Sequence, residues 1–79
     1  MALYAEGKQI VGYIEREPAS VNLLTGQGIP AQFYAVIEQH DDDYNVQVIG
    51  HFAEREEAML ALRNWFAARN LTTREIALI

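Results

Sequence analysis

The sequence predicts a small α+β domain: a four-stranded antiparallel sheet of two hairpins, one main helix packed on one face, and a short C-terminal helical turn or strand. Two patterns predict it. Apolar residues alternate with a period of two in residues 31–40 and 44–52, and recur every three or four residues in 55–69. Because 79 residues support only one hydrophobic core, we expect a single domain over residues 1–79.

The first hairpin is predicted in residues 3–14. A two-residue turn at Gly7 and Lys8 would place Ala5 opposite Ile10 and Tyr4 opposite Val11. Pro18 should end the second strand, because proline lacks the N–H that a strand pairing needs.

Residues 18–30 contain two glycines and two prolines and are predicted to be a loop. A loop of this length in so small a domain is often functional or packs as a lid. Its apolar residues favour packing over free flexibility; they are Val21, Leu23, Leu24 and Ile29. Whether it covers the second face of the sheet stays open.

The second hairpin is predicted to turn at Asp42 and Asp43, because only this register keeps apolar faces together. On one face it pairs Phe33 with Phe52, Ala35 with Gly50 and Ile37 with Val48. On the other face it pairs Tyr34 with His51 and Val36 with Ile49.

A helix is predicted from about Arg55 to Arg69. Its apolar stripe consists of Ala58, Met59, Leu62, Trp65 and Phe66. Asn70 can adopt the left-handed conformation that ends helices, with Leu71 folding back towards Phe66. For the last segment, Thr72 and Glu75 have the spacing of a capping box, whereas Ile76 and Leu78 alternate as in an edge strand. We favour the helical turn.

Charge is uneven along this acidic chain, whose net charge is −5. Residues 38–57 hold seven carboxylates against Arg55 alone. Asp41, Asp42 and Asp43 should lie about 30 Å from the second acidic group, at opposite ends of a nine-residue strand. That second group is Glu54, Glu56 and Glu57. Such acidic poles can meet a basic surface, although Asp also suits a turn and Glu suits the first turn of a helix.

The second sheet face is unusually apolar, whereas a solvated face should alternate to polar residues. It would carry Tyr4, Val11, Tyr13, Tyr34, Val36, Ile49 and His51. Either the loop or a partner should cover it, and a second copy of the chain is one such partner. Direct nucleic-acid binding is not expected, because it relies on clustered Lys and Arg.

Several chemistries are not expected. The chain has no cysteine, which removes thiolate metal sites and thiol catalysis. His40 beside the Asp turn could bind a divalent ion, but adjacent turn carboxylates rarely converge. Ser20 has no predicted triad partner, and Gly26-Gln27-Gly28 has no strand-to-helix context. We therefore expect no enzyme, metal or cofactor. No apolar run could span a membrane and no signal-peptide pattern is present, so we expect a cytoplasmic protein without membrane contact.

Residues 44–48 (YNVQV), with Phe52 and the run Glu56-Glu57-Ala58, resemble the opening strand and helix of SPOR peptidoglycan-binding domains. This resemblance implies binding to cell-wall glycan. In size, acidity and lack of cysteine the chain also looks like small accessory proteins of phages and prophages, a class that includes anti-CRISPR inhibitors.

The leading hypothesis is a non-enzymatic protein that binds another protein and inhibits or modulates nucleic-acid-handling machinery. Its contact residues would be Asp41, Asp42, Asp43, Glu54, Glu56 and Glu57 for charge, with Tyr34 and His51 on the sheet face. The alternatives are a homodimeric structural or accessory module and a SPOR-like glycan binder.

Overall fold

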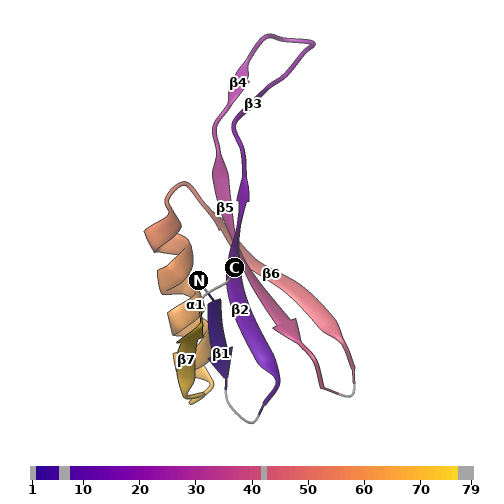
Figure 1. The fold of residues 1–79 in the computed structure, drawn as a ribbon. Helices are drawn as coiled ribbons and strands as arrows, with labels where there is room; N and C mark the ends of the chain where they lie inside the picture. Colours follow the sequence, from indigo (N-terminus) through magenta and orange to yellow (C-terminus); the bar gives the residue numbers. More distant parts are fainter. Residues whose placement is uncertain (1, 6–7, 42, 77–79) are drawn as a thin grey trace.

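The computed structural model describes residues 2–5, 8–41 and 43–76. Within these residues one helix and seven strands follow in the order β1 (Ala2–Ala5), β2 (Ile10–Glu17), β3 (Ser20–Val21), β4 (Gly28–Ile29), β5 (Gln32–Gln39), β6 (Asn45–Phe52), α1 (Arg55–Ala68) and β7 (Thr73–Ile76). Five strands form an antiparallel sheet in the order β6-β5-β2-β1-β7, and β3 pairs with β4 separately (Figure 1). The predicted α+β class is confirmed, with one more strand in the main sheet than expected.

The additional strand is β7, so the favoured helical turn after residue 72 is wrong. Thr73 pairs with Ala5 and Ile76 with Ala2. One side of β1 is occupied by β2, and its other side needs backbone partners, which β7 supplies. Glu75 does not cap a helix but forms an ion pair with Arg63 of α1. Leu78 lies outside the described residues.

The first hairpin has the predicted register. Ala5 lies opposite Ile10 and Tyr4 opposite Val11. β2 ends at Glu17, directly before Pro18. The proposed turn glycine, Gly7, lies outside the described residues.

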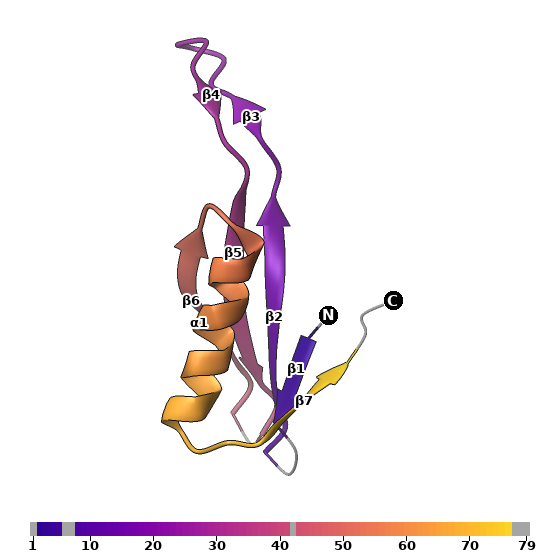
Figure 2. The same ribbon diagram turned by 90° about the vertical axis from the view of Figure 1, so that its left-hand side faces the viewer.

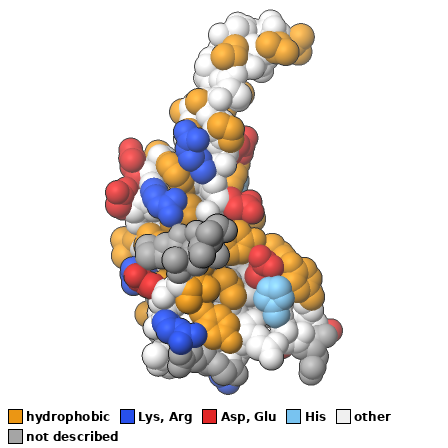
Figure 3. Space-filling model, viewed as in Figure 1, with side chains coloured by type: hydrophobic (Ala, Val, Ile, Leu, Met, Phe, Trp, Pro, Cys, Tyr) orange, Lys and Arg blue, Asp and Glu red, His pale blue; other side chains and the backbone are white. Residues whose placement is uncertain are grey.

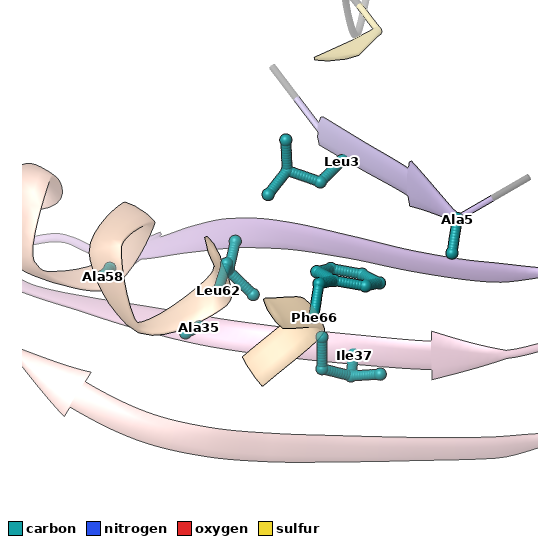
Figure 4. Close-up of a cluster of buried hydrophobic side chains, with 7 residues drawn as sticks. All are labelled: Leu3, Ala5, Ala35, Ile37, Ala58, Leu62 and Phe66. Carbon is teal, nitrogen blue, oxygen red and sulfur yellow. The ribbon is translucent and has the colours of Figure 1, made fainter. Parts of the chain in front are cut away.

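The hydrophobic core lies between α1 and one face of the sheet (Figure 2). Its fully buried members come from β1, β5 and α1 and lie around the Phe66 ring (Figure 4). Besides Phe66 they are Leu3, Ala5, Ala35, Ile37, Ala58 and Leu62. Gly12 of β2 faces this cluster, where an added Cβ would lie 2.8 Å from a ring carbon of Phe66. The missing side chain therefore lets the helix approach the sheet closely.

The end of α1 has the predicted form. Asn70 is left-handed, with φ 55°. The backbone N–H of Leu71 donates to the Phe66 carbonyl at 3.1 Å, and the Leu71 side chain packs against the core. This bond satisfies a carbonyl that the end of the helix would otherwise leave unpaired.

The second hairpin keeps the predicted register only near its open end. Phe33 lies opposite Phe52 and Ala35 opposite Gly50 as predicted, but Val36 then lies opposite Val48 rather than Ile49. A β-bulge at Ile49 causes this shift, so the predicted pairing of Ile37 with Val48 is also wrong.

The segment of residues 18–30, which we call the arm, extends away from the rest of the molecule (Figures 1 and 2). It forms a narrow hairpin in which Ser20 pairs with Ile29 and Val21 with Gly28. The molecule measures 48 Å along its longest axis but only 26 and 25 Å across. The alternative that this segment covers the second sheet face is therefore wrong, since the arm points outward.

Candidate protein-binding surface

Among the described residues, no helix or strand packs on the side of the sheet opposite α1, which we call the open face. Val36 in the middle of this side is only 2% exposed, so the exposed apolar part of the open face lies along β6. Cross-strand pairing assigns its apolar and aromatic members, which are Tyr4, Val11, Tyr13, Tyr34, Val36, Val46, Val48 and His51. A solvated sheet face would be largely polar, so this composition is typical of a surface that another molecule covers.

The bulge at Ile49 changes which residues of β6 belong to the open face. Ile49 packs against the core instead of lying on the open face as predicted. Val46 and Val48 move onto the open face, opposite Glu38 and Val36, and remain 48% and 52% exposed. The bulge thus enlarges the exposed apolar area at the sheet edge.

Tyr34 and His51, the two sheet residues predicted for partner contact, lie together. They are cross-strand neighbours, and their rings meet edge to face with centroids 4.7 Å apart. The Tyr34 hydroxyl also donates a hydrogen bond to the Glu17 carboxylate. This arrangement fixes the Tyr34 ring at the end of the open face that lies next to the arm.

A second polar group on the open face centres on Glu38. The Tyr44 hydroxyl donates to its Oε1 at 2.8 Å, and His40 Nε2 lies 3.2 Å from the same oxygen. Hydrogen bonds from Tyr13 and then Tyr44 hold the pKa of Glu38 below its usual value. Burial, followed by the hydrogen bond to Glu38, raises the pKa of Tyr13 to about 12. The hydrogen bond to Glu38 also raises the pKa of Tyr44.

The acidic residues predicted for partner contact occupy two separate places. Asp41 and Asp43 are exposed in the β5–β6 turn, and Asp42 lies outside the described residues. Glu54 precedes α1, and Glu56 and Glu57 lie in its first turn. These two groups lie at opposite ends of β6, as expected, and do not form one patch (Figure 1). The helix-start position also suits carboxylates on its own, because it stabilises negative charge.

The arm presents the most exposed apolar side chains. Leu23 and Leu24 are 95% and 96% exposed, and Val21 and Ile29 are also exposed. The Asn22 side-chain oxygen accepts from the backbone N–H of Leu24 at 2.9 Å, which shapes the tip. In Figure 3 hydrophobic side chains lie at the arm tip, while the Lys, Arg, Asp and Glu side chains lie on the body.

A hollow of about 310 Å³ lies where the arm joins the sheet. Its lining residues are Pro30, Ala31, Gln32, His51, Phe52 and Ala53. It therefore adjoins both the arm and the His51 end of the open face.

Sequence reasoning did not predict that Glu38, Tyr13 and Tyr44 form a hydrogen-bonded group, although the strand pattern contained a signal for it. Placing Glu38 on the same strand face as Tyr34 and Val36 implies that it neighbours tyrosines across the sheet. It also missed the exposure of Leu23 and Leu24, because apolar residues in a loop ordinarily indicate burial.

No protein-family model matches the chain, and no curated protein or solved structure resembles it significantly. Among the described residues, no helix is long and apolar enough to cross a membrane.

Proposed function

We propose that this protein is a non-enzymatic interaction module that binds another protein through its open face. The observation that carries this proposal is the exposed apolar edge of that face, where Val46 and Val48 are about half exposed beside Tyr44. Aromatic and aliphatic side chains grouped in this way are typical of the centre of a protein interface.

The partner that fits best has an apolar surface with a basic rim. Among the described residues, Glu15, Glu17 and Glu38 belong to the open face. These carboxylates and the exposed ones at both ends of β6 belong to a chain whose net charge is −5. Opposite charge speeds and orients association. Because proteins that handle nucleic acid present basic surfaces, the concrete form of the proposal is an inhibitor or modulator of such machinery.

The test is affinity capture from host lysate with two matched variants, each divided into nuclease-treated and untreated halves. Val48→Glu places a charge on the open face, whereas Leu60→Glu places one on the outer side of α1, where Leu60 is 59% exposed. We expect the wild type and Leu60→Glu to retain a nucleic-acid-binding complex in both halves, and Val48→Glu to lose it. Equal capture by the two variants would exclude the open face as the contact. Capture only in the untreated half would show that nucleic acid bridges the contact.

A second candidate function is a homodimeric accessory module. The observation that favours it is the large surface of the chain, 5567 Å², against about 4,900 Å² for a compact protein of 9.0 kDa. The radius of gyration, 14.6 Å, likewise exceeds the value of about 12 Å expected for a compact domain of this length. Covering this additional surface with a second copy would remove the excess.

A further inference from the structure

Among the described residues, the arm and the β6 side of the open face are two exposed apolar surfaces that no other element covers. We infer that they cover each other between two copies: the arm of each copy lies along the open face of the other, in a two-fold symmetric dimer. This inference rests on the homodimeric candidate function and specifies its interface. A two-fold axis makes the two arm-to-face contacts identical, so each arm is covered by one face and each face by one arm.

The lengths of the two surfaces agree. β2, which runs the length of the open face, has eight residues and therefore spans about 26 Å. With a long axis of 48 Å, the arm accounts for about 22 Å of the molecule. Two copies can be placed antiparallel, with the two-fold axis passing where each arm joins its sheet. Each arm then lies opposite the full length of the partner's open face.

Charge favours this arrangement over direct packing of the two open faces. The arm, residues 18–30, contains no charged side chain. The described part of the open face carries Glu15, Glu17 and Glu38, together with Arg74 opposite Tyr4, so two such faces in contact would bring a net excess of like charge together. The arm brings apolar side chains without adding a carboxylate.

The surface of the chain also leaves room for an interface. The surface in excess of a compact monomer is about 700 Å² per chain. A standard stable interface buries about 800 Å² from each partner. The excess surface of this extended chain is thus comparable with the area that one partner buries in a standard interface.

The geometry identifies the residues that meet. An arm that runs antiparallel along the partner ends near the turn between β5 and β6, because this turn lies at the end of the sheet away from the arm (Figure 1). Leu24 at the tip should therefore contact Val46, which lies near this turn and is 48% exposed. The tips of the two arms lie far apart in this dimer.

The first experiment measures mass in solution by analytical ultracentrifugation. We expect the wild type to sediment at twice 9.0 kDa. A double variant, Leu23→Ser with Leu24→Ser, should weaken the dimer at least about a hundredfold, because four exposed leucines per dimer lose their contact. The matched control is Leu60→Ser, which removes an exposed leucine from α1 and should leave the dimer unchanged. Circular dichroism checks that each variant is folded.

The second experiment locates the contact by disulfide formation, which is possible because the chain has no cysteine. Leu24→Cys is mixed under mild oxidation with Val46→Cys or, as a control, with Leu60→Cys. We expect a mixed disulfide with Val46→Cys and none above background with Leu60→Cys.

Three results would overturn the inference: a monomeric wild type, a dimer that the arm variant leaves intact, or equal cross-linking to both positions. A monomeric wild type that still captures a partner through Val48 would leave the first proposed function standing. A dimer that does not depend on the arm would leave the homodimeric function standing with another interface.

Discussion

Gly12 shows how one residue without a side chain sets the distance between two layers. An added methyl group would lie 2.8 Å from Phe66, 3.1 Å from Leu62 and 3.2 Å from Ile37, all fully buried in the core. None of these neighbours lies at a flexible surface, so the helix would have to shift. Glycine thus costs some strand propensity here but allows tight packing.

We therefore predict that Gly12→Ala lowers the free energy of unfolding by about 1–3 kcal/mol, the usual range for an overfilled core. Chemical denaturation followed by circular dichroism measures the change. Gly28→Ala is the matched control, because no atom lies within 4 Å of the added Cβ and the arm is solvated. Its stability should stay within about 0.5 kcal/mol of the wild type. Equal effects at both positions would contradict the packing that we describe at Gly12.

Glu38 is the residue whose charge controls two tyrosines. We predict that Glu38→Gln lowers the pKa of both Tyr13 and Tyr44, because the hydrogen bond and repulsion from the carboxylate currently raise them. Burial should still keep the pKa of Tyr13 above the ordinary value. The ultraviolet absorbance of ionised tyrosine, followed through alkaline titration, measures the shift. Glu57→Gln removes the same charge at the start of α1 and should change nothing in this titration.

The same shifts set the direction of the pH dependence. The pKa of Glu38 is lowered in the folded protein, so its contribution to stability is present above the pKa of an unfolded glutamate, about 4.3, and is lost as the pH falls. The pKa of Tyr13 is raised to about 12, so its contribution is present below about pH 10 and is lost between there and 12. Both contributions should decrease in Glu38→Gln. A variant with the wild-type pH dependence of unfolding would contradict this account.

At the scale of elements, β6 shows where sequence reasoning succeeds and where it stops. Alternation correctly paired Phe33 with Phe52 and Tyr34 with His51. It could not reveal the bulge, because Val46, Val48 and Ile49 are all apolar and fit either face. Gly50 makes room for the ring of Phe52, whose atoms lie 2.6 Å from the position of a Cβ. Ile49, next to Gly50, is the extra residue of the bulge, and the bulge turns its side chain towards the core.

The preference for a C-terminal helical turn and the prediction that the arm packs were wrong for different reasons. The alternation of Ile76 with Leu78 was a local signal for a strand, but the free edge of β1 that decides between strand and helical turn lies about seventy residues earlier. By contrast, Asn70 and Pro18 act on their immediate neighbours, and both helix end and strand end were predicted correctly. The arm was predicted to pack because apolar side chains are normally buried within their own chain.

For the whole molecule, stability should come from the sheet and α1 alone. All residues of the arm are exposed, and its two leucines contribute nothing to the core. We predict that replacing residues 22–27 by a two-residue Asn-Gly turn changes the free energy of unfolding by less than about 1 kcal/mol, as expected for a solvated surface segment. Thermal and chemical unfolding at protein concentrations that keep the chain monomeric measure this change. A much larger loss would mean that the arm supports the fold.

The projecting arm has a consequence for how this protein can change during evolution. Within one chain, Leu23 and Leu24 are free of the packing demands that restrict Leu62 or Phe66. Substitutions at the arm tip can therefore alter which surface is recognised while the scaffold stays folded. The same separation makes the tip a natural place to graft a foreign peptide, held about 22 Å away from the body on a twisted β-ribbon.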